Sequence, residues 1–149
     1  MPLMDEKDKA ILRILQKDAR TPFARIARIL GVSEATIYLR VKRLIKAGIL
    51  RGYHADVDPA KAGLATQAFV FVKVSPRRSR DAAEKVRGIP GIYEVYNVTG
   101  EYQLLAKVLA RDREELARIV DRIGGIDGVS DINVVYVLRV VKEERILRL

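Results

Sequence analysis

The feature that most constrains the fold of this chain is a two-residue break, Gly31-Val32, between two short helical segments. Before the break, apolar residues recur at helical spacing over residues 23–30 and stop at Gly31. After it, Ser33 is a preferred N-cap residue, and the sequence predicts a helix that runs to Ala47 and ends at Gly48. Two helices joined by so tight a turn match the helix-turn-helix arrangement.

One more helix is predicted upstream, from Glu6 to about Lys17, with Asp5 as its N-cap. In the helix after it, Thr21 is the expected N-cap and Pro22 the first helical residue, because proline at that position loses no hydrogen bond. The chain therefore opens with three short helices, and the last two form the helix-turn-helix pair.

The third helix has an apolar stripe and a polar flank beside it. At 100° per residue, its expected core positions fall within about 80° of arc. These positions are Ile37, Val41, Leu44 and Ile45. Thr36, Arg40 and Arg43 share the adjoining flank. The second helix of such a pair enters the major groove of DNA, so this flank is the predicted reading edge.

The side chains on this edge and in the first turn of the helix suit contacts with DNA. Arginine donates to guanine, hydroxyl groups reach bases or phosphates, glutamate accepts from cytosine, and leucine can meet a thymine methyl group. Basic residues of the preceding helix are expected to hold phosphates. The candidate DNA contacts are Arg20, Thr21, Arg25, Ser33, Glu34, Thr36, Leu39, Arg40 and Arg43. The alternative is a solvated basic helix end that complements its dipole.

The charge distribution supports a polyanionic partner. The 149 residues carry 28 Lys and Arg against 19 Asp and Glu, a net charge of +9. Residues 1–54 hold 12 basic and 5 acidic residues, a net +7, whereas residues 55–149 hold 16 and 14. A basic module joined to a near-neutral one is typical of nucleic-acid binding, although charge alone also fits a solvated basic surface.

The second half of the chain alternates between strand and helix periods in the order β-α-β-β-α-β, the ferredoxin-like arrangement. The predicted strands are residues 69–74, 92–98, 104–109 and 132–138, and the predicted helices are residues 80–87 and 112–123. Two similar segments, residues 88–92 and 125–129, occupy the same helix-to-strand junction of the two halves. The predicted fold class is thus α+β, with a three-helix domain of the winged helix-turn-helix type before the sheet domain.

The domain boundaries follow from changes in composition. Residues 1–52 form the expected DNA-binding domain, and residues 53–65 are an extended segment and polar hinge. Residues 66–142 form the sheet domain and residues 143–149 a tail. Apolar residues alternate on both faces of the predicted strands, so we expect sheet-on-sheet self-association. We assign Phe69, Phe71 and Val95 to one face and Val70, Val72 and Tyr96 to the other.

Several functional classes are disfavoured. The sequence has no Cys and a single His, His54, so it predicts no thiolate or multi-histidine metal site and no catalytic residue. No glycine fingerprint for a dinucleotide is present, and no cofactor is expected. No apolar run reaches the length of a membrane span and the N-terminus is too polar for a signal peptide, which favours a cytoplasmic protein.

The residues resemble the Lrp/AsnC family of leucine-responsive, or feast/famine, transcription regulators. In the first half the resemblance rests on Asp18-Ala19-Arg20, Ile26-Ala27, Gly31-Val32-Ser33, residues 40–44 and Gly48-Ile49-Leu50. In the second half it rests on residues 88–92, 99–102 and 125–129. It implies a regulator that binds pseudo-palindromic promoter DNA as a dimer, tetramer or octamer, and amino-acid effectors held between dimers.

The resemblance also implies an effector site formed by Gly100, Glu101, Tyr102, Gln103 and Asn133. Three positions depart from the family pattern: Gln103 stands where the family usually has Asp, Asn133 where it often has Thr, and Arg25 where an acidic residue is frequent. An amide in place of a carboxylate removes a charge-assisted partner for an α-ammonium group, so the effector response is expected to be altered, weak or absent. Alternatively, Gln103 is a surface residue at a strand start. For the whole protein, the alternative to a regulator is an architectural protein that coats DNA with little sequence preference.

Overall fold

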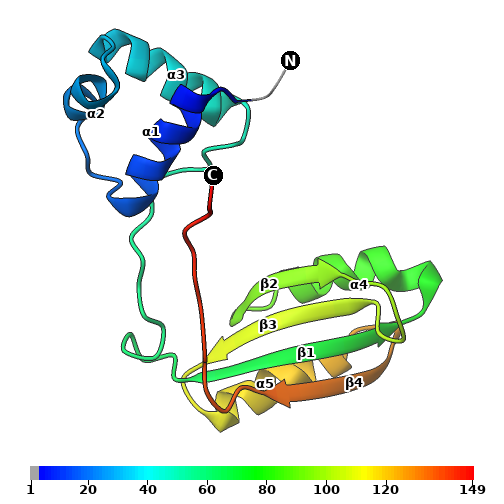
Figure 1. The fold of residues 1–149 in the computed structure, drawn as a ribbon. Coiled ribbons are helices and arrows are strands. Elements are labelled where there is room, and N and C mark those ends of the chain that lie inside the picture. Colours follow the sequence, from blue (N-terminus) through cyan, green and yellow to red (C-terminus); the bar gives the residue numbers. More distant parts are fainter. Residues whose placement is uncertain (1–3) are drawn as a thin grey trace. The chain divides into compact units, whose positions relative to one another are not determined.

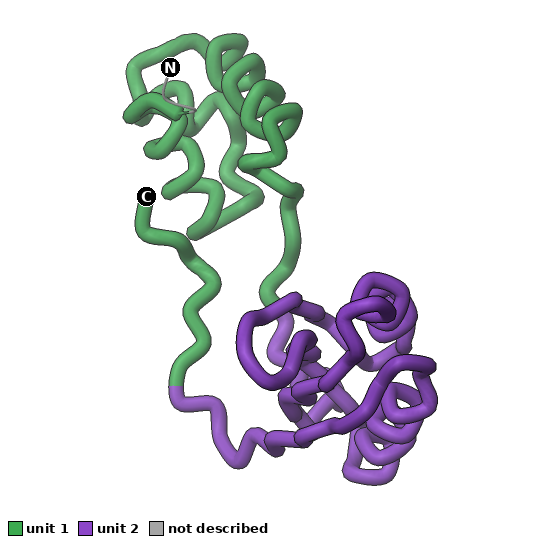
Figure 2. Tube along the Cα trace, turned by 90° about the vertical axis from the view of Figure 1, so that its right-hand side faces the viewer, with its two compact units in different colours: residues 1–56, 142–149 green, residues 57–141 purple. Residues whose placement is uncertain are grey.

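The computed structural model describes residues 4–149 and divides into two compact units. The first unit runs to Asp56 and includes residues 142–149, and the second comprises Val57–Val141. Figure 2 shows the chain passing into the second unit and then returning to the first. The C-terminal segment, which the sequence analysis separates as a tail, thus clusters with the helices of the first unit.

The first unit contains α1 (Glu6–Lys17), α2 (Phe23–Leu30) and α3 (Glu34–Lys46). The Asp5 and Asp8 side chains each accept a hydrogen bond from the other's backbone N–H, which forms a capping box at the start of α1. The Ser33 side chain accepts from the backbone of Thr36 and caps α3. The three predicted helices and two of their three predicted caps are confirmed.

The predicted cap of α2 is wrong by one residue. Pro22 is the N-cap, and its carbonyl accepts from the N–H groups of Arg25 and Ile26. The Thr21 hydroxyl instead donates to the Asp18 carbonyl at 2.8 Å and closes the preceding turn. The break after α2 is as predicted, because Gly31 adopts the left-handed conformation at φ +64°.

The three helices enclose a small apolar core. Its buried members are Ile11, Leu15, Ile26, Ala27, Ile37 and Val41. Leu44 is also buried, but Ile45, which the helical wheel placed in the stripe, is 47% exposed because it lies at the stripe's edge. Within residues 4–65 the structure contains no strand, so the segment of residues 53–65, which is predicted to be extended, pairs with no other strand, and the predicted wing is not formed.

The second unit confirms the predicted order of elements. Its strands are β1 (Thr66–Val74), β2 (Ile92–Asn97), β3 (Leu104–Ala110) and β4 (Val129–Tyr136), and its helices are η1 (Pro76–Arg78), α4 (Ser79–Arg87) and α5 (Arg113–Gly124). The four strands form one antiparallel sheet in the order β2-β3-β1-β4. Figure 1 shows α4 and α5 on the same side of this sheet.

Two glycines explain the repeated junction. Gly91 and Gly128 both have positive φ, +92° and +95°. A Cβ atom on Gly91 would lie 2.5 Å from the Ile119 side chain, and one on Gly128 would lie 2.6 Å from that of Arg78. Both junctions therefore need glycine for its backbone conformation and for the close approach of a neighbouring side chain.

The sheet register corrects the predicted faces. Val70, Ala106 and Val95 are cross-strand partners, so Val95 lies on the helix-covered face with Val70. Tyr96 pairs with Leu105, which pairs with Phe71, so Tyr96 belongs to the opposite face. The register shift between Ile92 and Glu94 changes the strand's phase, which simple alternation could not reveal. We call this opposite face, carrying Phe69, Phe71, Tyr96, Leu105 and Val135, the open sheet face.

Candidate nucleic-acid interface and ligand-binding loop

The side of α3 opposite its buried stripe is exposed. Leu39 is 63% exposed and lies near the middle of this surface, with Lys42 and Lys46 beside it. Ser33 and Glu34 are exposed at the N-terminal end of the helix. This end of a recognition helix is the part that meets base edges. The outward surface of α3 thus combines an apolar side chain, two ammonium groups and polar N-terminal groups.

The hydroxyl groups of the first turn are joined to each other. Ser33 Oγ accepts from the Thr36 backbone N–H at 3.1 Å and lies 2.8 Å from Thr36 Oγ1. Thr36 is only partly exposed, whereas Ser33 is exposed. A hydroxyl has one donor and two acceptor sites, so this pair keeps capacity for an outside partner.

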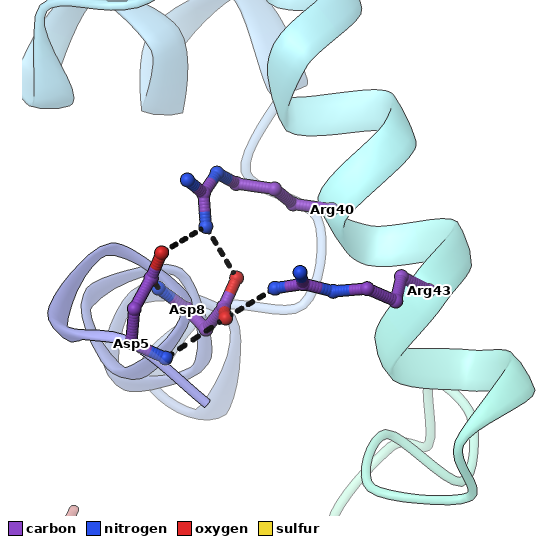
Figure 3. Close-up of polar contacts among 4 residues, drawn as sticks. All are labelled: Asp5, Asp8, Arg40 and Arg43. Carbon is purple, nitrogen blue, oxygen red and sulfur yellow. Dashed lines mark hydrogen bonds and ion pairs between the residues drawn. The ribbon is translucent and has the colours of Figure 1, made fainter. Parts of the chain in front are cut away.

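Arg40 and Arg43, which the sequence predicts to contact DNA, extend in the structure toward the start of α1 (Figure 3). Arg40 Nη1 donates to Asp5 Oδ2 at 2.7 Å and to Asp8 Oδ1 at 2.8 Å. Arg43 Nη2 donates to Asp8 Oδ2 at 2.5 Å. Asp8 is fully buried, with 0% of its surface exposed. We call Asp5, Asp8, Arg40 and Arg43 the α1–α3 clasp.

The hydrogen bonds of the clasp shift the pKa values of Asp5 and Arg40. The hydrogen bond from the Asp8 backbone, followed by that from Arg40, lowers the pKa of Asp5 to about 2. Hydrogen bonds to Asp5 and then Asp8 raise the pKa of Arg40 above its usual value. Both groups are thus held in their charged forms.

Sequence reasoning missed Asp8 as a member of a site. One signal was present, because Asp5 and Asp8 have the three-residue spacing of a capping box. The helical wheel also placed Arg40 next to the buried stripe rather than opposite it, but it could not show that α1 lies there.

The remaining candidate DNA contacts are spread over the turn before α2 and the helix itself. The backbone N–H of Arg20 donates to Asp18 Oδ1 at 2.9 Å, which orders this turn. Arg20 and Arg25 are exposed. Within residues 4–149 neither makes an ion pair, so both guanidinium groups keep their donors for an outside partner.

In the second unit, the predicted effector residues meet at one end of β1. Glu101 accepts a hydrogen bond from Lys73 Nζ at 3.1 Å, and the Tyr102 hydroxyl donates to Asp131 Oδ2 at 2.9 Å. The hydrogen bond to Asp131 raises the pKa of Tyr102. Gly100 has a φ of +117° in the loop before β3.

Phe71 connects this loop to Asn133. The Tyr102 ring packs edge-on against Phe71 with ring centroids 6.0 Å apart. Asn133 is the β4 partner of Phe71 on the open sheet face and is exposed. The structure therefore brings the predicted loop and Asn133 to the same part of the sheet.

Gln103 is a structural part of the loop rather than a free surface residue. Its Oε1 accepts from the Val74 backbone N–H at 2.9 Å, and its Nε2 donates to the Glu101 carbonyl at 3.1 Å. A carboxylate has no donor and could not make the second bond. The amide therefore suits this loop in a way that the family's usual aspartate does not.

Within residues 4–149, no group of His, Asp and Glu side chains is arranged to hold a metal ion. No helix in this range is long and apolar enough to cross a membrane. His54, the single histidine, is exposed.

Two family models match the chain, one in each half. The model of the AsnC-type helix-turn-helix domain matches residues 4–45. The model of the Lrp/AsnC ligand binding domain matches residues 67–147. The three-helix unit and the βαββαβ unit together define a class of DNA-binding regulators with a separate ligand-binding domain.

Relatives of known class match over nearly the full length. HTH-type transcriptional regulator LrpA of Pyrococcus horikoshii is 40% identical over 94% of this chain and 100% of its own. HTH-type transcriptional regulator FL11 of Pyrococcus furiosus is 38% identical over 95% and 93%. The chain belongs to the Lrp/AsnC family of transcriptional regulators, and it is a regulator rather than an enzyme.

Solved structures give the same result. The structure of E. coli AsnC matches with a TM-score of 0.89 at 30% identity, over 95% of this chain and 96% of that one. A complex of a transcriptional regulator from Neisseria meningitidis with L-methionine matches with a TM-score of 0.87 at 28% identity, over 97% and 96%. The resemblance inferred from the sequence motifs is confirmed.

Proposed function

We propose that α3 enters the major groove of promoter DNA with the surface opposite its buried stripe. The observation that carries this proposal is the exposure of Leu39, at 63%, on a helix whose opposite side buries Ile37, Val41 and Leu44. Lys42 and Lys46 flank it, in a domain where residues 1–54 hold 12 basic and 5 acidic residues. Charge of this sign attracts the phosphate backbone, and the exposed helix end offers groups for base edges.

The candidate contacts then divide into two groups. Ser33, Glu34, Thr36 and Leu39 are proposed to meet bases, because they lie at the N-terminal end or on the outward surface of α3. Arg20, Thr21 and Arg25, before and within α2, are proposed to hold phosphates. Arg43 keeps a proposed phosphate contact, since 59% of its side chain is exposed despite its bond to Asp8.

A footprint on selected DNA tests this proposal. The full chain is used to select duplexes from a random pool, and the winning duplex is then footprinted at low protein excess. Protection of a discrete pseudo-palindrome, with half-sites about one helical turn apart (~34 Å), is the expected result. Uniform protection along the duplex would contradict it and favour the architectural, DNA-coating alternative.

We also propose that the protein is a dimer, formed through the open sheet face. This face carries Phe69, Phe71, Leu105, Tyr96 and Val135, and neither α4 nor α5 covers it. Exposed apolar surface of this kind is normally buried by a partner. A dimer would present two copies of α3 to two half-sites, and further assembly to tetramers or octamers is what the family resemblance implies. The proposed place of action is the cytoplasm.

An effector is proposed for the loop from Gly100 to Gln103 together with Asn133. The match of residues 67–147 to a ligand-binding domain supports a ligand, and the related Neisseria protein was solved with L-methionine. The Gln103 amide is hydrogen-bonded to the backbone of Val74 and Glu101, and as an amide it provides no carboxylate for an α-ammonium group. We therefore expect an altered or weak response to amino acids. Calorimetric titration with the twenty amino acids measures this, and tight binding of an ordinary one would overturn the expectation.

A further inference from the structure

Asp8 is a buried acid in a basic domain, and it contacts the proposed DNA-binding helix. None of its surface is exposed, and three donors surround its carboxylate: Arg40 on Oδ1, and Arg43 and the Asp5 backbone N–H on Oδ2. Among residues 4–149, Asp8 is the one buried carboxylate. A buried charge is stable only while its partners stay in place.

The two arginines are held differently. Arg40 uses Nη1 for both Asp5 and Asp8, and its side chain is only 23% exposed. Arg43 uses Nη2 for Asp8, and most of its side chain is exposed. The guanidinium group has five donors, so Arg43 can keep its bond to Asp8 while another N–H reaches outward. Arg40 cannot turn outward without leaving Asp8.

The helix geometry points the same way. Arg40 lies beside the buried stripe of α3 and faces the start of α1 (Figure 3), whereas Leu39 and Lys46 lie opposite the stripe. If Arg40 turned outward to contact a base, the fully buried carboxylate of Asp8 would lose one of its two cationic partners. The α1–α3 clasp therefore holds α3 in position through the side of the helix that faces α1, and it leaves the outward surface of α3 free.

We propose that Asp8 is a positioning residue for DNA recognition, which keeps Arg40 in place when DNA binds while Arg43 bridges Asp8 and a phosphate. The inference rests on the proposed function, in which α3 enters the groove. It assigns Arg40 to the support of the reading helix rather than to a base. Specificity then depends on an acidic residue that touches no DNA.

The first experiment compares Asp8→Asn with Glu6→Gln in the full chain. Both changes remove one negative charge from the first turn of α1, but Glu6 is exposed and, among residues 4–149, its ion pairs are with Lys9 and Arg13. Affinity is measured for the selected duplex and for an unrelated duplex. If charge alone mattered, both variants would bind both duplexes at least as tightly as the parent chain.

The expected result separates the two variants. Asp8→Asn should bind the selected duplex roughly tenfold more weakly while its affinity for the unrelated duplex stays equal or rises. Glu6→Gln should lose no affinity for either duplex. Equal behaviour of the two variants on the selected duplex would overturn the proposal.

Two further measurements use Arg40→Gln, and the first of them, made in the parent chain, remains informative if Asp8→Asn does not fold. Should Arg40 contact a phosphate, Arg40→Gln would lower the slope of log affinity against log salt by about one; the proposal requires an unchanged slope. In the Asp8→Asn background, Arg40→Gln should cause no further loss of specific affinity, because Arg40 acts through Asp8. A full additional loss there would show a direct base contact.

A separate variant, Leu39→Ala, distinguishes a failure of the Asp8 proposal from a failure of the proposed DNA-binding function. If Leu39→Ala leaves DNA binding intact, the assignment of α3 to the groove fails. If Leu39→Ala weakens binding while Asp8→Asn behaves as Glu6→Gln does, only the role of Asp8 fails. Circular dichroism and thermal unfolding of each variant are the controls that test whether the helices are retained.

Discussion

At the scale of single residues, the structure distinguishes side chains that the sequence treats alike. Leu39 and Leu44 are both leucines of α3, yet one is 63% exposed and the other is buried. Gln103 and Gln67 are both glutamines at or in strands, yet of the two only the Gln103 amide makes side-chain hydrogen bonds within residues 4–149, and these join β1 to the loop before β3. A residue's role here follows from what its polar or apolar atoms touch.

Replacing Leu39 by Ala should weaken binding to the selected duplex by about 1–3 kcal/mol if its side chain meets a base. Stability should hardly change, because an exposed leucine contributes little to folding. The measurement is a titration by fluorescence anisotropy alongside a thermal unfolding curve. Leu138→Ala is the matched control, an exposed leucine of the second unit. Equal affinities for the two variants would contradict the predicted contact.

Replacing Gln103 by Glu should destabilise the second unit by about 1–3 kcal/mol, because the Glu101 carbonyl loses its donor and the new carboxylate faces carbonyl oxygens. Urea unfolding measures the change. Asn97→Asp introduces the same charge at the end of β2, where the exposed side chain makes no hydrogen bond within residues 4–149. The prediction fails if both variants unfold at the same urea concentration.

At the scale of elements, α1 and α3 are joined by charge as well as by apolar packing. The buried residues Ile11 and Ile37 belong to one core, and the clasp lies beside it. The capping box that starts α1 also supplies the two carboxylates that receive Arg40. One local motif thus performs a helix-capping role and a tertiary one.

The low pKa of Asp5 predicts an acid-dependent loss of stability. Its pKa is about 2 in the folded chain against 3.8 as the reference value, so the folded state favours the charged form. The contribution is fully present above about pH 4 and is lost as the pH falls toward 2. Asp5→Asn should flatten this part of the curve of unfolding free energy against pH. Asp121→Asn, an exposed aspartate on α5, should leave the curve's shape intact.

At the scale of the whole molecule, a basic helical unit is linked to a sheet unit that leaves one face open. The chain connects the units twice, because residues 142–149 return to α1. The Gln16 side chain bonds the backbone N–H and carbonyl of Leu147 at 2.7 and 3.1 Å, and Arg13 donates to the Leu149 carbonyl at 2.8 Å. The DNA-binding unit is therefore completed by residues that follow the sheet.

If the open sheet face forms the dimer, a carboxylate introduced on this face should break the dimer, whereas one introduced on the helix side should not. Val135 pairs with Phe69 on the open face, whereas its neighbour Val134 pairs with Val70 on the helix side. Their exposed fractions are similar, 44% and 39%. Val135→Glu should shift a dimer to monomer in sedimentation equilibrium, because a carboxylate would be buried between two sheets. Val134→Glu should leave the dimer intact, and dissociation by both variants alike would argue against this face.

The order and type of the elements, the helix-turn-helix pair and the family can all be predicted from the sequence. These follow from local signals, namely the apolar period, the caps at Asp5 and Ser33, and the left-handed turn at Gly31. The residue counts also place the excess of basic residues in the first third of the chain, and this excess indicates a polyanionic partner such as DNA.

Which neighbour each polar or exposed group meets depends on how the elements pack in three dimensions. A helical wheel gives the angle of Arg40, but the carboxylates that hold it come from α1, more than thirty residues earlier. Alternation gives two faces for β2, but the register shift after Ile92 decided that Val95 and not Tyr96 joins the core. The physical reason is that local periodicity fixes directions, whereas partners depend on packing between segments distant in sequence.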